Sequence, residues 1–494
     1  MRDQHGRQPG LCLSLVALAM LLASCRQPEA GKSEVTVIGD EPPSIVDPAA
    51  GPLTAPQAVL LSNVAQGLVR FDATGNIVSG LAERWNVSDD GLSYIFRLAS
   101  AEWPDGTKIG AQRVARILKQ QLGRRSRNSL KDTLGAVQDI VAMTDRVIEI
   151  RLVSPRPNLL PLLAQPEMAV LRNGRGTGPF TSTPTGEPGG ELRLVSEVTG
   201  SNEEVTRRDE VLLSGAPAEQ AVRAFAAGKA HLVLGGTFAD LPYARYVRLP
   251  RNSLRFDPAS GLFGLVPVSA EGAFSEPEVR RLLSAAVDRE ALATALNVPV
   301  FAARATVLEA GLDGLPEPAQ PAWFAVPIAD RRAALLTEAQ RLFGGTAKPV
   351  IRLSLPEGPG ADILSRRLAA DWAALGFTVE RAANAAAADF RLIDAVAPSS
   401  SPAWFLRSFR CGVVPLCDPE ADTLLDAARS TAIPPQRYAL LYEVSRRIDD
   451  AQLFIPLAAP VRWSLVSPRV QGFAGNRYAR HTLTDLEQRP ARGG

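Results

Sequence analysis

The sequence predicts an α/β fold, because segments with strand-like patterning alternate along the chain with segments of helical periodicity. Val147–Leu152 alternates apolar and polar residues, as a half-buried strand does. Ala111–Leu122 spaces its apolar side chains three and four residues apart, as an amphipathic helix does. Strands separated by helices predict mostly parallel sheets that are covered by helices on both faces.

The elements follow in order along the chain. In the first third, Val35–Ile38 and Tyr94–Leu98 are predicted strands, on either side of which lie turn-forming residues. Pro277–Leu296 has helical periodicity, over one helix or two consecutive ones. The later predicted elements are the strand Val350–Leu355, the helix Asp362–Leu375, the strand Phe377–Val379, the strand Asp389–Val396, the helix Arg437–Ile448 and the strand Phe454–Leu457. Gly376 stands where a helix-ending glycine belongs, so Val350–Val379 is predicted to be a strand–helix–strand unit.

Three stretches rich in proline, glycine and serine are predicted loops: Thr181–Gly190, Leu312–Pro327 and Pro398–Pro402. The polar tail Gln488–Gly494 is predicted to fray. The chain of 494 residues is 46% hydrophobic and 21% charged, which is typical of a globular protein of two or three domains. Its net charge of +2 gives no reason to expect nucleic-acid binding.

The first 25 residues carry an export signal. Arg2 and Arg7 precede the apolar run Leu11–Leu22, which is shorter than the roughly 20 residues that a spanning helix needs. The end of this segment, Leu21–Cys25 (LLASC), resembles the bacterial lipoprotein box, in which the chain is cut before an acylated cysteine. We therefore expect residues 1–24 to be a lipoprotein signal peptide, Cys25 to be lipidated, and the protein to lie in the periplasm, anchored to the membrane by that lipid. The alternative is an ordinary cleaved signal with an incidental cysteine.

Cysteine usage agrees with export. Cys12 leaves with the signal and Cys25 takes the lipid, so Cys411 and Cys417 remain in RCGVVPLCD. An even remainder in an oxidising compartment predicts one disulfide that closes a short loop, and two free buried thiols are the alternative. The processed chain holds only His231 and His481 as histidines, with no partner ligands nearby, so neither a metal nor any other cofactor is expected.

Six ordered segments resemble the extracellular solute-binding proteins of ABC importers, in the peptide, dipeptide and nickel class known as family 5. The longest is Gly80–Leu98 (GLAERWNVSDDGLSYIFRL), similar to the family's P-x-L-A-E-x-W-x-x-S-x-D-G-x-x-Y-x-F-x-L. The others are Glu41–Pro48 (EPPSIVDP), Val64–Asp72 (VAQGLVRFD), Trp103–Thr107 (WPDGT), Gly176–Phe180 (GTGPF) and Val279–Arg289. Within these segments, Trp85 and Tyr94 are expected to be core anchors rather than ligand contacts, because aromatic side chains mostly bury.

The resemblance implies a two-lobed periplasmic-binding-protein fold of the class II type, with a subdomain inserted in the first lobe. Residues 25–34 would form a lipidated linker. Lobe I would comprise residues 35–59, 175–255 and 457–494, the inserted subdomain residues 60–174, and lobe II residues 256–456. A solute would bind between the lobes, which close over it by a hinge motion.

The resemblance also implies a set of cleft residues and no catalytic residue. The candidate ligand-binding residues are Glu41, Gln66, Thr177, Gly178, Phe180, Asp394, Pro398, Ser399, Ser400, Trp404, Arg407 and Arg410. Arg407 and Arg410 would suit an anionic ligand, with solvated surface arginines as the alternative. Trp404 is interpreted equally well as a cleft residue or a core residue.

One departure from the family bears on the ligand. Peptide-binding members carry an aspartate that pairs with the ammonium group of the peptide, and aligning Pro402 and Phe405–Leu406 puts Pro398 at that position. A buried ammonium without a carboxylate costs several kcal/mol, so a free peptide is a doubtful ligand. Asp394 could substitute only if the strand register differs.

Three functions remain open. The first is a lipid-anchored monomer that delivers a small or peptide-like solute to an ABC permease. The second is a diverged envelope lipoprotein that acts as a scaffold, sensor or chaperone. The third, a hydrolase, is disfavoured because the chain has no G-x-S-x-G motif, and His231 is interpreted as a structural substitution; we expect no enzymatic activity.

Overall fold

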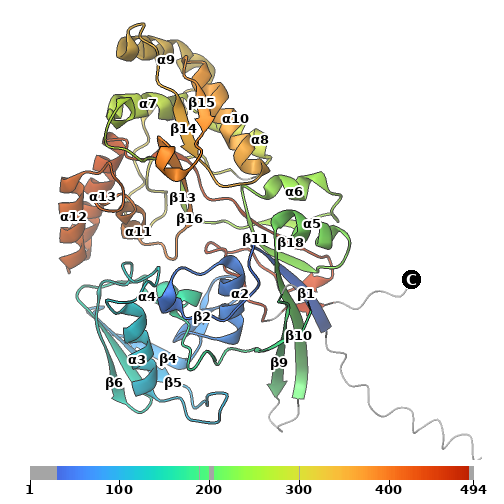
Figure 1. Ribbon diagram of the computed structural model, residues 1–494. Coiled ribbons are helices and arrows are strands. Elements are labelled where there is room, and N and C mark those ends of the chain that lie inside the picture. The colour runs from blue at the N-terminus through green and yellow to red at the C-terminus, as the bar shows by residue number, and fades with distance from the viewer. Residues whose placement is uncertain (1–30, 188–189, 200–204, 300, 485, 489–494) are drawn as a thin grey trace, which may run out of the picture.

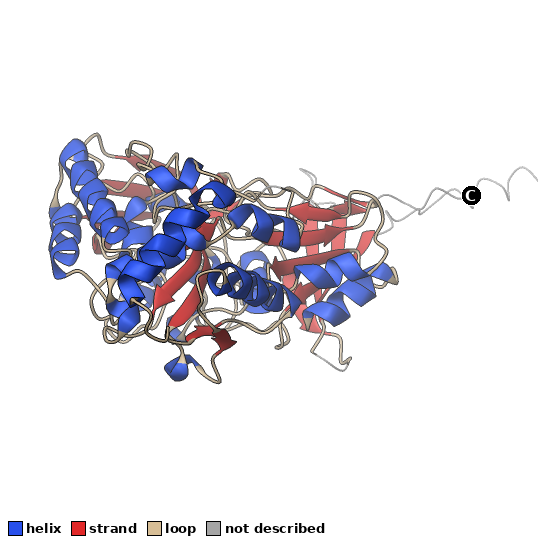
Figure 2. Ribbon diagram, turned by 90° about the horizontal axis from the view of Figure 1, so that it is seen from above, coloured by secondary structure: helices blue, strands red, loops and turns tan. Residues whose placement is uncertain are grey.

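Three large β-sheets, each with its own helices, and two two-stranded pairs make up the described part of the protein in the computed structural model (Figure 1). The structure describes residues 31–187, 190–199, 205–299, 301–484 and 486–488. The seven-stranded sheet lies at the lower right of Figure 1, the four-stranded sheet at the lower left and the five-stranded sheet above them. Seen from above, the molecule is elongated and helices lie over and around the strands (Figure 2).

The seven-stranded sheet draws its strands from distant parts of the chain. Its order is β12 (Leu254–Phe256), β18 (Arg462–Val466), β11 (Leu232–Thr237), β1 (Gly31–Ile38), β10 (Val205–Ala216), β9 (Leu192–Thr199) and β8 (Thr181–Pro184). The helices that follow or precede these strands are α2 (Ala55–Val64), α5 (Ala218–Ala226) and α6 (Leu241–Tyr246). Val35 and Val37 of β1 are buried in a core with Leu213 of β10, so the central strands hold this body together.

The four-stranded sheet is antiparallel throughout and lies in residues 82–152. Its order is β4 (Ala82–Val87), β5 (Ser93–Leu98), β7 (Val147–Leu152) and β6 (Val137–Thr144). Helix α3 (Ala111–Leu122) covers it, and the hairpin of β2 (Val69–Phe71) and β3 (Ile77–Ser79) and helix α4 (Leu159–Leu163) complete this part. Tyr94 is buried in its core, and the Tyr94 hydroxyl donates to the carbonyl of Arg156 at 2.8 Å, while Trp85 is half-buried against the same core.

The five-stranded sheet is built around the predicted strand–helix–strand unit. Its order is β15 (Val379–Arg381), β14 (Ile351–Ser354), β16 (Phe390–Val396), β13 (Gly261–Pro267) and β17 (Ile455–Ala458). The helices of this part are α7 (Pro277–Ala286), α8 (Arg289–Leu296), α9 (Ile328–Phe343), α10 (Pro359–Ala373), α11 (Pro402–Arg407), α12 (Pro419–Ser430) and α13 (Pro434–Asp450). Trp372 of α10 is fully buried, and its indole N–H donates to the carbonyl of Leu283 at 3.0 Å, which fixes α10 against α7.

The remaining elements are short. A two-stranded pair joins β19 (Val470–Gln471) to β20 (Glu487–Gln488). The 3₁₀ turns are η1 (Pro48–Ala50), η2 (Pro166–Met168), η3 (Ala273–Ser275), η4 (Ala322–Ala325) and η5 (Ala385–Ala387). In the described residues, no helix combines the length and the apolarity needed to cross a bilayer.

The prediction of mostly parallel sheets is wrong. In the five-stranded sheet β14 runs parallel to β15 and β16, whereas β13 pairs antiparallel with β16 and β17. In the seven-stranded sheet only the two pairings of β1 are parallel. The cause is the path of the chain: strands that enter or leave a lobe, and strands joined by hairpins, pair without a crossover helix and run antiparallel.

Most of the predicted elements have the expected type. The helix Ala111–Leu122 coincides with α3, and Val350–Val379 forms a parallel strand–helix–strand unit. Pro277–Leu296 divides into α7 and α8, because Asp288 caps α8 by accepting from the backbone N–H of Ala291 at 2.9 Å. The predicted loop Thr181–Gly190 is wrong in its first four residues, which form β8 and pair with β9.

The predicted disulfide is confirmed. Cys411 and Cys417 are bonded, with their Cα atoms 5.1 Å apart, and they close the loop between α11 and α12. The predicted signal peptide and the lipidation site Cys25 lie outside the described residues, as does most of the polar tail.

A candidate solute cleft between two lobes

Two short connections carry the chain between the seven-stranded and five-stranded sheets. One is 257–260, from β12 to β13, and the other is 459–461, from β17 to β18. They run side by side, because the N–H of Asp257 donates to the carbonyl of Arg462 at 3.0 Å. A pair of adjacent connections is the arrangement about which two lobes can rotate, with few backbone angles absorbing the change.

A cavity of about 710 Å³ lies beside these two connections. Its size falls in the range of roughly 300–1,000 Å³ typical of small-molecule sites. Its polar and charged lining residues are Asp257, Ser260, Arg304, Thr306, Glu309, Gln320, Arg462 and Arg477. Phe256, Val298, Leu308 and Val461 supply apolar wall. The cavity therefore combines apolar surface with a few converging polar groups, which is how ligand pockets are commonly built.

Most charged side chains in the cavity wall have a partner of opposite charge, either in the wall or behind it. The Arg304 guanidinium forms an ion pair with Glu309, and both side chains are nearly buried, at 13% and 11% exposure. The Ser260 hydroxyl also donates to Glu309. Burial lowers the pKa of Arg304, while Glu309 opposes that shift. The wall can thus orient a polar solute through groups that are already fixed, without adding an unpaired buried charge.

The predicted cleft residue Asp394 belongs to a second such pair. Arg462 Nη1 donates to Asp394 Oδ1 at 2.8 Å, and each side chain is 15% exposed. Burial raises the pKa of Asp394, and Arg462 acts in the opposite direction. The structure therefore places Asp394 behind the cavity wall, bound to an arginine that lines the cavity.

Pro398, which is predicted to stand at the position of an ammonium-binding aspartate, faces a side chain of the four-stranded part. Gln165 Nε2 donates to the Pro398 carbonyl at 3.0 Å. Arg480 in turn donates to Gln165 Oε1 at 3.1 Å and to Glu167 Oε1 at 2.7 Å. The polar group that meets Pro398 is thus an amide, and the nearest carboxylate of this network, Glu167, is held by Arg480.

The neighbouring serines also bridge separate parts of the chain. Ser399 is 1% exposed, and its hydroxyl accepts from the N–H of Ser401 at 3.4 Å. The Ser400 hydroxyl lies 2.9 Å from Asp313 Oδ2 and 3.1 Å from Asn158 Oδ1. Segment 398–401 therefore lies at the junction of the four-stranded part with the five-stranded part.

Other predicted cleft residues are dispersed. Gln66 donates to the Thr177 carbonyl at 2.7 Å, and Phe180 is buried in the core of the seven-stranded sheet. Gly178 packs on α2, where an added Cβ would lie 2.4 Å from the Asn63 carbonyl oxygen. Glu41 is exposed, and Trp404 is half-buried against the core of α11–α13. The structure does not gather these residues around one cavity, and their role in binding stays a prediction.

Arg407 and Arg410 line a second, smaller cavity of about 80 Å³ between the four-stranded part and α11–α13. Arg410 makes a two-pronged ion pair with Asp426, at 2.9 and 2.8 Å. Arg407 donates to the backbone carbonyls of Asp132 and, at 3.2 Å, of Ala403. The two arginines therefore differ: Arg410 is paired within α11–α12, and Arg407 reaches across to the four-stranded part.

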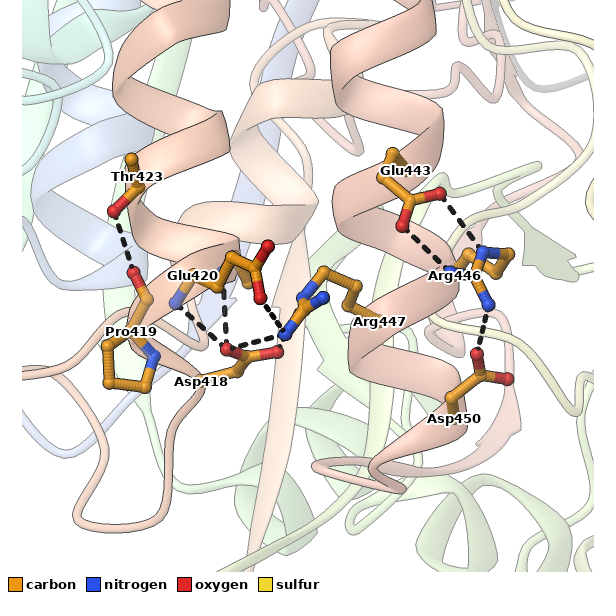
Figure 3. A network of polar contacts seen from close by, with 9 residues as sticks. Asp418, Pro419, Glu420, Thr423, Glu443, Arg446, Arg447 and Asp450 are labelled. Atoms are coloured by element: carbon orange, nitrogen blue, oxygen red, sulfur yellow. Dashed lines mark hydrogen bonds and ion pairs between the residues drawn. The ribbon is translucent and has the colours of Figure 1, made fainter.

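A surface network joins the start of α12 to the end of α13 (Figure 3). Asp418 caps α12 through the N–H of Glu420 at 2.9 Å and accepts from Arg447 Nε at 2.7 Å. Arg446 joins Glu443 and Asp450 along α13. Exposed pairs of this kind contribute little individually, about 0–1 kcal/mol each, so the network aligns the two helices more than it stabilises the fold.

Several of the residues that line the two cavities were not predicted. Arg304, Glu309 and Arg462 line the larger cavity, and Arg156 and Arg437 line the smaller one. They lie in segments without a motif, and no spacing rule links them. The predicted proline-rich loop Leu312–Pro327, which contributes Gln320 to the larger cavity, was the only signal near the first group, since a long irregular loop often carries function.

Sequence comparison matches most of the chain to a known protein family. Residues 76–389 match the model of the bacterial extracellular solute-binding proteins, family 5 Middle. The chain is 29% identical over 133 residues to the probable deoxycholate-binding periplasmic protein YgiS of Escherichia coli K12. That alignment spans 23% of this chain and 24% of YgiS, so it covers about a quarter of the relative.

Structural comparison extends over nearly the whole chain. The murein tripeptide binding protein MppA of Escherichia coli superposes with a TM-score of 0.77 at 18% identity, over 93% of this chain and 99% of that one. The unliganded open form of MppA superposes with a TM-score of 0.69 at 18% identity, over 94% of this chain and 99% of that one. OppA of Haemophilus influenzae, in complex with the peptide RPPGFSPFR, gives 0.76 at 16% identity, over 92% and 99%.

These likenesses confirm the predicted fold, an α/β two-lobed periplasmic-binding-protein architecture. The match to the family model covers well over half of the chain, so the predicted family is confirmed as well. This chain belongs to the bacterial extracellular solute-binding proteins of family 5.

Proposed function

We propose that the protein captures a small solute in the cavity beside the two interlobe connections and delivers it to an ABC importer. The observation that carries the proposal is the position of that 710 Å³ cavity, next to the backbone segments that would act as the hinge. A solute bound there touches both lobes, so it favours their closed arrangement by its differential affinity. No bond-making group is required, and we propose that the protein is not an enzyme.

We further propose that binding does not depend on an ammonium group of the solute. Two observations support this: Pro398 lies outside the lining of the larger cavity, and Asp394, the carboxylate nearest to it in the sequence, is already paired with Arg462. Relatives and structural neighbours named above bind a murein tripeptide, a peptide or, in the case of YgiS, probably deoxycholate. That range agrees with a family whose fold is kept while the site changes.

We further propose that the mature chain begins at a lipidated Cys25 and works as a monomer tethered outside the cytoplasmic membrane. One acyl-modified terminus followed by a short linker leaves the lobes free to move. The lipidated residue is tested directly by mass spectrometry of the N-terminal peptide from the native protein. An unmodified Cys25 or cleavage at another residue would contradict this part of the proposal.

Native mass spectrometry of protein purified from its own envelope tests the solute-binding role. The expected result is a bound small molecule that is lost on unfolding and that raises the unfolding temperature when it is added back. A ligand at 100 times its dissociation constant stabilises the folded state by about 2.7 kcal/mol, which a thermal shift detects readily. No carried-over molecule and no shift with any solute of a broad panel would favour the alternative, an envelope scaffold, sensor or chaperone.

A further inference from the structure

The smaller cavity is built from arginines of two separate parts of the molecule. Arg156 belongs to the segment that precedes α4, and Arg407, Arg429 and Arg437 belong to α11, α12 and the first turn of α13. In Figure 1 these helices stand at the left, above α4 and the four-stranded sheet. The four guanidinium groups therefore meet at the junction that forms when these two parts come together.

Hydrogen bonds across this junction run to backbone carbonyls rather than to carboxylates. Arg429 Nη2 donates to the Gly135 carbonyl at 2.6 Å, and Arg437 Nη1 donates to the Pro155 carbonyl at 2.5 Å. Arg156 Nη2 donates to the Arg429 carbonyl at 3.0 Å. Each guanidinium has five N–H donors, so these contacts leave most of the donors available to a ligand.

The charges around the cavity are unbalanced. Three acidic residues also line it: Asp426 pairs with Arg410, whereas Asp313 accepts only from the uncharged hydroxyl of Ser400. The third, Asp132, is exposed at the rim. Among the arginines that line the cavity, Arg410 is the one that forms an ion pair with a described residue. Four guanidinium groups thus converge with two carboxylates, those of Asp132 and Asp313, that form no ion pair with them, so positive charge is in excess.

Burial strengthens the mutual repulsion of these arginines. Burial, and after it Arg437, Arg407 and Arg429, lower the pKa of Arg156 to about 10. Burial, and after it Arg429, lower the pKa of Arg407 to about 10, although Asp132 acts in the opposite direction. Both groups stay charged at neutral pH, and a nearby anion would relieve the repulsion.

The shape and lining of the cavity select the kind of anion. Its volume of about 80 Å³ is roughly half of the 150 Å³ that holds a benzene molecule, so a compact ligand fits and a peptide does not. An apolar part of the lining is supplied by Leu134, Leu152, Leu162, Leu425 and Leu441. A planar anionic head with a short apolar tail matches both features, since arginine forks pair with carboxylates through two parallel hydrogen bonds.

From this geometry we infer a second binding site, for a small carboxylate, in which Arg156, Arg407, Arg429 and Arg437 hold the anion between the four-stranded part and helices α11–α13. The site shares no lining residue with the larger cavity. Because its ligand contacts both sides of the junction, occupancy favours the closed arrangement of the two parts. This second site can bind its ligand whether or not a solute occupies the larger cavity.

Isothermal titration calorimetry of the mature protein with sodium propionate tests the inference. Matched titrations use 1-propanol, propylammonium chloride and inorganic phosphate at the same ionic strength. Propionate is expected to bind with saturation, and the three other probes at least tenfold more weakly or not at all. Equal binding of propanol or propylammonium would overturn the role of the negative charge, and equal binding of phosphate would overturn the apolar wall. Absence of propionate binding would overturn the site itself.

Two variants give the same test at the level of the residues. Arg407→Gln is expected to weaken propionate binding at least tenfold, whereas Arg446→Gln, on the outer network of α13, is expected to leave it unchanged. Equal affinities for the two variants would overturn the assignment. If Arg407→Gln fails to fold, the comparison of propionate with propanol on the unaltered chain still decides the question. A solute from the envelope that binds equally well to Arg407→Gln would support the larger cavity alone, so the two proposals fail separately.

Discussion

At the scale of single residues, the charged groups near the interlobe connections are mostly neutralised by partners of their own. Arg304 with Glu309 and Arg462 with Asp394 are nearly buried pairs beside the larger cavity. Removing one member of such a pair leaves an uncompensated buried charge, which costs far more than losing an exposed pair. These residues therefore contribute to the stability of the cavity wall as well as to its polarity.

We expect Glu309→Ala to lower the free energy of unfolding by about 3 kcal/mol, because Arg304 would keep its buried charge without a partner. Urea unfolding followed by circular dichroism measures this loss. The matched control is Glu278→Ala, which removes an exposed partner of Arg341 and should cost less than about 1 kcal/mol. Equal losses for the two variants would show that the buried pair does not stabilise the wall.

Asp449 provides a pH-dependent contribution to stability. Burial raises its pKa to about 7, while the N–H of Val307 donates to the carboxylate at 2.8 Å and acts in the opposite direction. The folded state therefore holds the proton more tightly than the unfolded state, whose aspartate has a pKa near 3.9. This contribution is fully present below about pH 4 and is lost as the pH rises toward 7.

Asp449→Asn should remove that dependence, since the amide oxygen can still accept from Val307. We expect the variant to be more stable than the unaltered protein at pH 8, by up to about 4 kcal/mol, and the difference to shrink at pH 4. Urea unfolding at pH 4, 6 and 8 gives the comparison. A stability difference that does not vary with pH would rule out titration of Asp449 in this range.

At the scale of elements, the sequence predicted those parts whose periodicity is local. The helix Ala111–Leu122 and the strand Val147–Leu152 were found at their bounds, because a single face of each is buried. The direction of strand pairing was not predicted correctly, because it depends on where the chain returns after a long excursion. Strand β17, for example, returns to pair antiparallel with β13. Strand β8 was predicted to be a loop, since its residues TSTP form the edge of the sheet and pair only with β9.

Gly178 shows how a motif residue serves the packing of elements. The resemblance suggested a ligand role for it, and the structure places it against the backbone of α2. We expect Gly178→Ala to lower the free energy of unfolding by about 1–3 kcal/mol, because the new methyl group would overlap backbone atoms that cannot move aside. Gly51→Ala is the control, since an added Cβ there meets no atom within 4 Å. A neutral effect of Gly178→Ala on thermal unfolding would contradict this interpretation.

At the scale of the whole molecule, function depends on contacts that no local pattern predicts. Arg437 reaches the carbonyl of Pro155 across 282 positions of sequence, and Arg480 reaches Gln165 across 315. The family resemblance predicted two lobes and a cleft, yet of the charged residues that line the two cavities it named only Arg407 and Arg410. Those residues come together only because distant segments return to the same junction, so the candidate site was predicted far less completely than the fold.

Small-angle X-ray scattering of the mature protein tests the central claim most directly, with and without a solute that raises its unfolding temperature. The account predicts that the saturating solute decreases the radius of gyration, because the lobes rotate about segments 257–260 and 459–461 toward each other. A radius of gyration that stays the same while the solute is bound would contradict closure, and with it the proposal that this protein works by enclosing its ligand.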